Sequence, residues 1–490
     1  MTMGLPGLHE TSDGSLAWDL PARLNMAAQC LDHPADQLAV VDLTGAARRD
    51  VSYGDLAEMA DGLALALRGR AAPGDRVGVL LSQSPWCAAA HLAIWKIGAI
   101  SVPLFKLFKC DALASRVQDA GIGIVLTDAE GADLLGDLAE AWIAQDAGVP
   151  GEPVAFADTG PEDPAVLIYT SGTTGSAKGA LHGHRVLTGH LPGVSLSHDH
   201  LGQVGDCLWT PADWAWIGGL FDVAMPGLAL GVPVVAARLD KFSAEGAARI
   251  IAQGAVRNVF FPPTALRMLK AADQSLPSLR SVASGGEPLG AEMLAWGRRS
   301  FGLEINEFYG QTECNMTVSS CGAEFTARPG CIGKPVPGHD VEVIDEAGQP
   351  TRDEGDIAVR RGSASMMLRY WNRPEATSEK FRGDWMLTGD RGVWDDAYLR
   401  FVGRDDDLAR LHQALTGADD AVGIRPAGVT GMGGIGKTQL AVEFAYRYGR
   451  WYAGVHWLDA AQPAGLAAEW SFENADQPAR DDSGNGRDGH

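Results

Sequence analysis

The sequence predicts an α/β protein that is built on a parallel sheet. Short apolar segments that are typical of buried strands, at 77–81, 122–126 and 165–168, alternate with helical patterns. Strands and helices in alternation are typical of βα units, whose helices cover the faces of the sheet. A chain of 490 residues is also too long for one ordinary core, so we expect more than one domain.

Composition and charge exclude several classes of protein. Hydrophobic residues make up 46% and charged residues 21% of the chain, which is typical of globular proteins. The formal net charge of −22 argues against nucleic-acid binding and against anionic membrane surfaces. No apolar run approaches the ~18 residues that span a bilayer, and residues 1–20 lack a secretory pattern, so we expect a cytoplasmic protein without membrane insertion. The seven cysteines are scattered without a Cys-x-x-Cys pair, which indicates neither zinc nor a disulfide framework.

The N-terminal part, residues 15–70, is predicted to contain a helix, a pair of strands and a second helix. The second helix begins near 51–56, and apolar residues then repeat at helical spacing from Leu56 to Leu67. The polar segment 136–159, in which glycine and proline recur, is expected to lie on the surface.

The segment 169–179, Tyr-Thr-Ser-Gly-Thr-Thr-Gly-Ser-Ala-Lys-Gly, follows an apolar strand and carries the strongest chemical signal. Its glycines let backbone N–H groups approach a ligand, and successive N–H groups in turns form an anion site. Its hydroxyl groups add donors, and Lys178 adds a mobile positive charge that suits phosphate. The segment therefore predicts a polyphosphate site, and a flexible connection between strands is the alternative.

This segment resembles the phosphate loop of the AMP-binding, adenylate-forming (ANL) enzymes, which include acyl-CoA synthetases, peptide-synthetase adenylation domains and luciferases. Further motifs follow in the family's order to about Asp407. The resemblance implies an ANL-type large N-terminal domain of βα units, which we expect at 1–403. It also implies ATP, Mg²⁺ and coenzyme A as cofactors or co-substrates and a small carboxylate as partner. The implied phosphate-loop contacts are Thr170, Ser171, Gly172, Thr173, Thr174, Gly175 and Lys178.

Later motifs complete the nucleotide site that the resemblance implies. The segment 281–289 resembles the family's adenine-edge segment, in which glycines let a flat ring lie against the backbone. The segment 306–313, Asn-Glu-Phe-Tyr-Gly-Gln-Thr-Glu, resembles the motif in which tyrosine stacks on adenine, threonine touches the α-phosphate and glutamate holds Mg²⁺. The segments 385–390 and 402–407 resemble the ribose and hinge motifs. The implied catalytic residues are Lys178, Thr312 and Glu313, with Glu313 as metal ligand, and the other nucleotide contacts are Gly285, Gly286, Glu287, Pro288, Tyr309, Gly310, Asp390 and Arg404.

Three tryptophans, Trp209, Trp214 and Trp216, stand within eight residues. Such side chains form a corner of a core as readily as the wall of a site. The block also resembles the segment that lines the acyl pocket in acetyl- and medium-chain acyl-CoA synthetases. Gly310 stands where acetate-specific relatives place a tryptophan, so the resemblance implies room for a longer acyl chain. We therefore expect a short- to medium-chain or aryl carboxylate other than acetate.

After Asp407 the family pattern stops. Lys437 is the one lysine that follows in this sequence, so the family's C-terminal domain and its adenylating lysine are expected to be missing and replaced. Residues 431–438 match a Walker A loop in a strand–loop–helix context, and 401–459 resembles the beginning of an NB-ARC-type NTPase. We expect a partial P-loop fragment at 404–460, and at 461–490 a disordered tail or the start of a laminin-G-like domain. The contacts of this second phosphate loop are Gly431, Gly436, Lys437 and Thr438.

The sequence therefore predicts an AMP-forming acyl-CoA synthetase-type ligase that adenylates a carboxylate and then forms a CoA thioester. We expect the activity to be impaired, because the family's C-terminal domain is replaced. Two alternatives stay open: a nucleotide-dependent switch protein that uses Lys437 and Thr438, and an inactive module that keeps the adenylate pocket. The sequence carries no indication of the oligomeric state.

Overall fold

The computed structural model describes residues 7–10, 16–149, 151–170, 177–239, 241–402, 455–458, 466–471 and 480–481. The chain divides into two compact units. The first comprises 1–170, 177–388 and 392–401, and the second comprises 171–176, 389–391 and 402–490. No helix in the described ranges is both long and apolar enough to cross a membrane.

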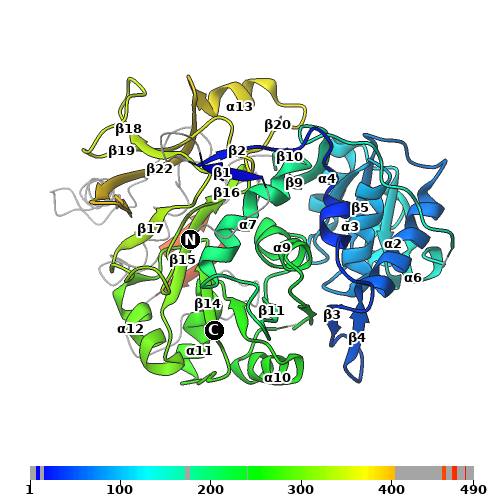
Figure 1. The fold of residues 1–490 in the computed structure, drawn as a ribbon, viewed down its shortest axis with the longest axis horizontal. Helices are drawn as coiled ribbons and strands as arrows, with labels where there is room; N and C mark the ends of the chain where they lie inside the picture. Colours follow the sequence, from blue (N-terminus) through cyan, green and yellow to red (C-terminus); the bar gives the residue numbers. More distant parts are fainter. Residues whose placement is uncertain are drawn as a thin grey trace. The chain divides into compact units, whose positions relative to one another are not determined.

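A seven-stranded sheet forms one half of the first unit (Figure 1), in the order β20-β10-β9-β6-β5-β7-β8. Neighbouring strands from β9 to β8 run parallel, whereas β10 runs antiparallel to both β9 and β20. The strands are β5 (Arg76–Leu80), β6 (Ile100–Pro103), β7 (Ile124–Thr127), β8 (Glu140–Ile143), β9 (Pro164–Tyr169), β10 (Gly179–Gly183) and β20 (Arg369–Tyr370).

A second, fourteen-stranded sheet has the order β18-β19-β22-β23-β17-β16-β15-β14-β13-β11-β12-β3-β4, with β21 paired to β22. Its parallel part runs from β15 to β3, and antiparallel pairs flank this part on both sides. The parallel part and the β4 edge comprise β3 (Leu38–Asp42), β4 (Arg49–Ser52), β11 (Leu208–Trp209), β12 (Val234–Ala236), β13 (Asn258–Phe260), β14 (Ser281–Gly285) and β15 (Ile305–Gln311). The other end comprises β16 (Cys314–Ser319), β17 (Cys331–Pro335), β18 (Val341–Ile344), β19 (Gly355–Arg360), β21 (Phe381–Arg382), β22 (Trp385–Asp395) and β23 (Tyr398–Phe401).

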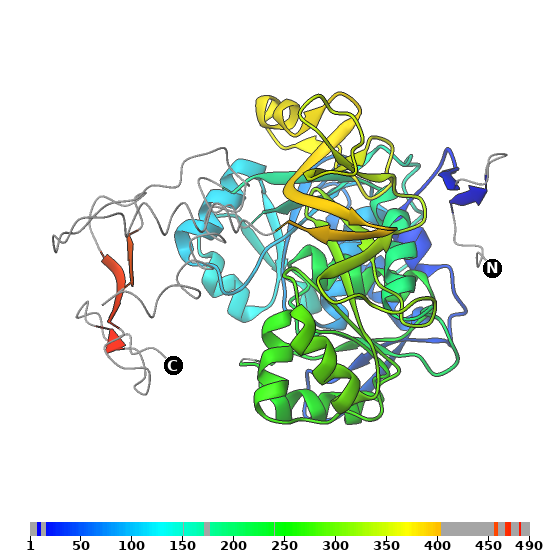
Figure 2. The same ribbon diagram turned by 90° about the vertical axis from the view of Figure 1, so that its left-hand side faces the viewer.

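Helices pack on both faces of both sheets. Between the sheets lie α1 (Met26–Leu31), α2 (Tyr53–Leu67), α3 (Pro85–Lys96), α7 (Arg185–Ser197) and α9 (Met225–Ala229), and one buried cluster joins them to side chains of both sheets. The outer face of the larger sheet is covered by α10 (Ala244–Gly254), α11 (Pro263–Ala271) and α12 (Gly290–Phe301), and that of the smaller sheet by α4 (Cys110–Ala120). In Figure 1 the green helices α11 and α12 lie on the opposite side of the ribbon from the blue helices α2 and α3, and Figure 2 shows the same ribbon turned by 90°.

Strand β9 shows why the parallel strands are continuous apolar runs. Val166 and Ile168 belong to the cluster between the sheets, whereas Leu167 and Tyr169 belong to the cluster on the outer face. Because successive side chains of a strand point to opposite faces, a strand that is covered on both faces needs apolar residues at every position. The α/β class that the sequence predicts is therefore confirmed.

Helix α2 begins where the sequence predicts. The Ser52 hydroxyl accepts the Asp55 N–H, and the Asp55 carboxylate accepts the Ser52 N–H, so the two residues form a capping box. Leu56, Leu63 and Leu67 are fully buried on one side of this helix. Helical spacing and the cap thus act together to place α2 against α3 and the β3–β4 edge of the larger sheet.

The expectation that 136–159 lies on the surface is wrong in part. The segment contains β8 and α6 (Ala144–Ala147), and Val154 is buried. The Val154 N–H donates to Asp61 Oδ1 at 2.9 Å, and this carboxylate pairs with the buried Lys96 Nζ at 2.5 Å. The strand pairs with β7 over four residues, but its apolar run from Ala141 to Ile143 is shorter than the runs that indicate a buried strand.

The second unit contains a three-stranded antiparallel sheet of β24 (Val455–Leu458), β25 (Leu466–Ser471) and β26 (Arg480–Asp481). The predicted Walker A loop at 431–438 lies outside the described residues, as does Arg404.

Candidate functional site

The predicted phosphate loop connects β9 to β10 in an antiparallel hairpin. Tyr169 pairs with Gly179, and the Thr170 N–H donates to the Lys178 carbonyl at 2.9 Å. The two ends of the loop are thereby held together at the carboxyl end of β9, the edge of a parallel sheet where ligands of α/β proteins bind. The loop residues Ser171, Gly172, Thr173, Thr174 and Gly175 lie outside the described residues.

The base of this hairpin is anchored to the end of α4. The Tyr169 hydroxyl donates to Asp119 Oδ2 at 2.7 Å, and Arg373 binds Oδ1 of the same carboxylate at 3.2 Å. Trp371 Nε1 donates to the Asp119 carbonyl at 3.1 Å. Burial, and after it the hydrogen bond to Asp119, raises the pKa of Tyr169, so its hydroxyl stays a donor. These contacts tie the strand that leads into the phosphate loop, and the segment after β20, to the end of α4.

Lys178 and Glu313, which come from different motifs, meet at Tyr370. The Lys178 ammonium lies 5.3 Å from the centroid of the Tyr370 ring, within the range of a cation–π contact. The Tyr370 hydroxyl donates to Glu313 Oε1, and the Met367 N–H donates to the Glu313 carbonyl at 2.7 Å. Burial first, and then the Glu313 carboxylate, raises the pKa of Tyr370. The structure thus brings Lys178, which the motif predicts to bind phosphate, and the buried carboxylate of Glu313 to one place.

Tyr370 is absent from the residues that the sequence predicts for the site. It lies on β20, which pairs with β10 opposite Ala180, and it is 57 residues from Glu313 along the chain. No spacing pattern links positions so far apart. Only the pairing of β20 with the phosphate-loop hairpin could have indicated the contact.

A buried histidine holds the neighbouring residue of the same motif. His182 Nε2 lies 2.8 Å from the Thr312 carbonyl, and since a carbonyl only accepts, this nitrogen carries the proton and donates. Burial, with smaller contributions from His190 and Arg185, lowers the pKa of His182 to about 3, so the ring is neutral near pH 7. Thr312 and Glu313 form the turn between β15 and β16, because Gln311 pairs with Cys314. Strand β10 therefore holds this turn directly.

Gln311 connects the same turn to β22. Its Nε2 donates to the Thr388 carbonyl at 2.7 Å, and Lys380 Nζ donates to its Oε1 at 3.1 Å. Asp390, predicted to bind ribose, follows Thr388 by two residues on the same strand.

The predicted adenine-edge segment lies beside the strand that carries Tyr309, because Gly285 pairs with Phe308. Gly286 has φ +100°, a conformation that favours glycine, and a Cβ there would meet no atom within 4 Å. A Cβ on Gly285 would instead lie 2.5 Å from the Phe308 ring. Tyr309 is buried and packs edge-on against Phe401, with ring centroids 5.3 Å apart. Gly285 thus lets β14 and β15 lie close together. Gly286 leaves the backbone open on the side where a side chain would lie.

Two carboxylates fix the loop that follows, in which Pro288 lies. Glu287 pairs with Arg267 at 2.9 Å on the surface, and the Leu289 N–H donates to Glu307 Oε1 at 3.0 Å. Glu307 is buried beside β14, and this burial raises the pKa of its carboxyl from 4.5 to about 7. Glu307 is a second residue of the region that the motifs do not assign.

The three tryptophans do not form one wall. Trp209 is fully buried in the outer cluster of the larger sheet, where it packs edge-on against Phe261. Trp214 is fully buried in the cluster between the sheets. Trp216 is half-buried, and its ring centroid lies 5.4 Å from that of Phe105 and 5.8 Å from that of Phe108. Two of the three side chains therefore take the core position that the sequence left open.

The space beside Gly310 is occupied by the next strand. A Cβ on Gly310 would lie 2.2 Å from Asn315 Oδ1 and 2.5 Å from Asn315 Cα. The strand pairing shifts register between Tyr309 and Gln311, and Gly310 is the residue within that bulge. The interpretation of Gly310 as room for an acyl chain is corrected here, because the glycine instead allows β16 to approach β15.

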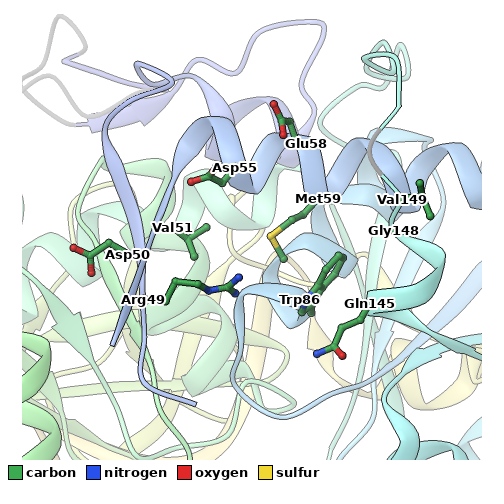
Figure 3. A pocket seen from close by; sticks show the side chains of 10 residues that line it. All are labelled: Arg49, Asp50, Val51, Asp55, Glu58, Met59, Trp86, Gln145, Gly148 and Val149. Atoms are coloured by element: carbon green, nitrogen blue, oxygen red, sulfur yellow. The ribbon is translucent and has the colours of Figure 1, made fainter. Parts of the chain in front are cut away.

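A separate pocket of about 490 Å³ lies beside α2 and β4 (Figure 3). Met59 and Trp86 lie together at its centre in Figure 3, with Arg49 on one side and Gln145 on the other. None of the residues that the motifs predict for ATP lines it. The pocket is therefore distinct from the Lys178–Glu313 site.

Comparisons with known proteins agree on one family. The profile of the AMP-binding enzyme family matches residues 26–371. The acetyl-coenzyme A synthetase of Bacillus subtilis is 30% identical over 424 residues, which cover 79% of this chain and 73% of that protein. The human mitochondrial acyl-coenzyme A synthetase ACSM4 is 31% identical over 369 residues, which cover 68% of this chain and 62% of that protein.

Solved structures show the same similarity. ATP-bound MatB from Rhodopseudomonas palustris has a TM-score of 0.71 and 26% identity, and the match covers 81% of this chain and 84% of MatB. An acyl-CoA synthetase from Brucella canis has a TM-score of 0.73 with 24% identity over 89% of both chains, which concerns the fold alone.

Replacing Tyr370 with phenylalanine tests the contact that joins Lys178 to Glu313. We expect Tyr370→Phe to lower the free energy of unfolding by roughly 1.5–3 kcal/mol, because a buried carboxylate loses a hydrogen-bond donor. Tyr398→Phe is the matched control, since its hydroxyl donates to the neutral Thr326 carbonyl and its loss should cost about 0.5–1.5 kcal/mol. Urea unfolding measures both losses in free energy of unfolding. A smaller loss for Tyr370→Phe than for Tyr398→Phe would contradict the hydrogen bond from Tyr370 to a buried carboxylate.

Replacing Gly310 with alanine tests whether a glycine is needed at this position for β16 to lie close to β15. The added methyl group overlaps Asn315, so we expect Gly310→Ala to destabilise the fold by about 1–3 kcal/mol. Gly123→Ala serves as control, because a Cβ there meets nothing within 4 Å and no positive φ opposes it. If thermal and urea unfolding show equal stability for both variants, β16 does not constrain Gly310.

The raised pKa of Glu307 predicts a pH dependence of stability. The Glu307 carboxyl keeps its proton up to about pH 7 in the folded state but only up to about pH 4.5 in the unfolded state. Its contribution to the free energy of unfolding is therefore complete below pH 4.5 and is lost as the pH rises through 7. Glu307→Gln keeps an acceptor for the Leu289 N–H but cannot ionise. Between pH 4 and pH 8 we expect the variant to gain up to about 3 kcal/mol of stability relative to the natural protein.

Urea unfolding at both pH values measures this gain. Glu346→Gln, at an exposed position, is the control and should show no such trend. A pH-independent difference between Glu307→Gln and the natural protein would show that the carboxyl ionises normally.

Proposed function

Since the chain belongs to the AMP-binding enzyme family, as an AMP-forming ligase of the acyl-CoA synthetase type, we propose that it joins a small carboxylic acid to coenzyme A at the expense of ATP. In the first step, a carboxylate oxygen attacks the α-phosphorus of ATP, an acyl-adenylate forms and pyrophosphate leaves. In the second step, the CoA thiol attacks the acyl carbonyl and AMP leaves. The observation that carries the proposal is the meeting of Lys178 and Glu313 around Tyr370.

The proposed roles follow from the positions of these side chains. Lys178 stands at the end of the phosphate loop, where its ammonium would offset the negative charge of the phosphates. Thr312, held by His182, would contact the α-phosphate from the β15–β16 turn. Tyr309 and the Gly285–Pro288 segment would bind adenine, and Asp390 and Arg404 would bind the ribose. Catalysis of the first step is then chiefly a matter of position and charge neutralisation.

The donor set also fits Mg²⁺. A buried carboxylate beside a phosphate-binding lysine supplies the hard oxygen ligand that this ion uses together with phosphate oxygens. Glu313 would hold the ion, which supplies charge neutralisation on the phosphates when bound. Tyr370 fixes one oxygen of that carboxylate and so orients it.

For the acyl group we propose a short- to medium-chain or aryl carboxylate. The half-buried ring cluster of Trp216, Phe105 and Phe108 supports an apolar or aromatic acyl group, since exposed aromatic edges pack well against such groups. Gly310 does not support this choice of acyl group, because Asn315 occupies the space beside it. The anthranilate CoA ligase AuaEII, crystallised with anthranoyl-AMP, shares this fold with a TM-score of 0.70.

ATP–pyrophosphate exchange with a panel of carboxylates tests the proposal. Acetate, hexanoate, octanoate and benzoate are offered to the purified chain with Mg²⁺ and labelled pyrophosphate. We expect carboxylate-dependent exchange that is faster with one of the larger acids than with acetate. Exchange that is fastest with acetate would reject the acyl class, and no exchange with any carboxylate would reject adenylation by this chain.

The two lysines separate the ligase from the nucleotide-dependent switch. We expect Lys178→Ala to slow exchange by about 10²–10³, because one preorganised charge donor is lost. Lys437→Ala, in the predicted Walker A loop, is the matched control and should leave exchange and ATP binding unchanged. Loss of ATP binding in Lys437→Ala but not in Lys178→Ala would favour the switch instead.

A further inference from the structure

Three side chains with different metal-binding atoms meet at a place that the predicted ATP site does not use. His200 follows α7, and Cys321 and Glu324 follow β16. The ring nitrogen, the sulfur and a carboxylate oxygen of these residues all lie within 4.8 Å of one another. His200 Nε2 lies 3.3 Å from Glu324 Oε1. A tetrahedral ion with ordinary zinc–ligand distances separates a nitrogen and an oxygen ligand by roughly 3.3 Å. Two of the three atoms therefore already have the required separation.

The cluster has a buried base and an open side. Cys321 is fully buried, whereas the side chains of His200 and Glu324 are 31% and 48% exposed. A metal ion can therefore reach the sulfur past two side chains that are partly exposed to solvent. An ordinary surface ion pair between His200 and Glu324 does not account for a cysteine sulfur beneath it.

Hydrogen bonds fix the backbone that carries each ligand. The His200 N–H donates to the Ser195 carbonyl at 2.8 Å, and the Glu324 N–H donates to the Cys321 carbonyl at 3.0 Å. Asp199 Oδ1 accepts from Cys321 Sγ at 3.7 Å and from the Ala323 N–H at 3.0 Å. The carboxylate of Asp199 thus holds the segment after Cys321 through the Ala323 N–H, and the thiol proton that it accepts is released when the sulfur binds a metal ion as a thiolate.

The chemistry of the three ligands selects one class of ion. Sulfur and imidazole ligands disfavour Mg²⁺ and Ca²⁺, which take oxygen ligands, and favour borderline-soft divalent ions. We propose that His200, Cys321 and Glu324 form a Zn²⁺ site that fastens the end of α7 to the segment after β16. Three protein ligands leave a fourth tetrahedral position for water. Burial raises the pKa of Cys321 to about 12, so binding is compared at one fixed pH.

The test uses the full-length chain, freed of metal with a chelator and desalted, and Zn²⁺ alone as ligand. Competition with a chromophoric zinc indicator at pH 7.5 measures affinity, and elemental analysis measures stoichiometry. We expect one equivalent of Zn²⁺ and a rise in melting temperature that depends on zinc concentration. With Co²⁺ in its place we expect a thiolate-to-metal charge-transfer band and the intense visible bands of tetrahedral coordination.

Single replacements identify the ligands. Cys321→Ser, Glu324→Gln and His200→Asn should each weaken zinc binding at least tenfold. Asparagine is chosen at position 200 because His200 has φ +61°, a conformation that asparagine tolerates. Cys110→Ser is the matched control, since Cys110 is an exposed thiol, and it should bind zinc as the natural protein does. Lys178→Ala should also keep the metal, because the two sites share no residue.

Several results would overturn the proposal. These are zinc binding that survives in His200→Asn and Glu324→Gln, binding that is lost in Cys110→Ser, or a cobalt spectrum without the thiolate band. Because His200 and Glu324 are partly exposed, their variants should fold, as circular dichroism will check, so the proposal remains testable even if Cys321→Ser does not fold.

Discussion

The hydrogen bond from Tyr370 to Glu313 joins the two sheets at the point where the phosphate loop begins. Tyr370 belongs to the smaller sheet through β20, and Glu313 lies in the β15–β16 turn of the larger sheet. The hydrogen bond from His182 to the Thr312 carbonyl also joins the smaller sheet to this turn, since His182 lies on β10. Both donors are buried, and burial raises the pKa of the Tyr370 phenol and lowers that of the His182 imidazole, so each donates as a neutral group. The relative position of the lysine and the carboxylate therefore follows from how the sheets are joined.

Close packing of the backbone also holds the two sheets together where α7 lies against β16 and against the segment at Ser365. A Cβ on Gly193 of α7 would lie 2.5 Å from Met316 Cβ, and one on Gly189 would lie 2.2 Å from the Ser365 nitrogen. Strand β16 is thus held between α7 and the bulge at Gly310. Asn315 adds a buried hydrogen bond from its Nδ2 to Asp222 Oδ1 at 2.7 Å. Interiors this dense do not accept an added methyl group without a shift, so these glycines reflect packing rather than substrate size.

Prediction from sequence succeeded where one local pattern decides the structure, and failed where contacts join distant segments. The apolar runs predicted the βα units, because strands covered on both faces need apolar residues throughout. Strand β8 was missed because its apolar run from Ala141 to Ile143 is only three residues long, and Tyr370 because nothing local relates it to Glu313. The tryptophans were grouped by proximity in sequence, although Trp209 and Trp214 pack in different clusters. The expectation that the cysteines bind no zinc stays a prediction, and the proposed site joins His200 to Cys321, which only the fold brings together. The individual roles of the site residues remain predictions.

Asn306 relates the proposed zinc site to the nucleotide motif that begins with it. Its Nδ2 donates to the Ser197 carbonyl and to Asp199 Oδ1, both at 3.0 Å, and its Oδ1 accepts the Gly322 N–H at 2.8 Å. The β15–β16 hairpin is therefore held near Asn306 at one end and at the Thr312–Glu313 turn at the other. A slip of one residue in a strand moves every side chain to the opposite face. Fastening both ends of the hairpin fixes its register, and the register decides that Tyr309, Thr312 and Glu313 keep the positions from which they would meet ATP.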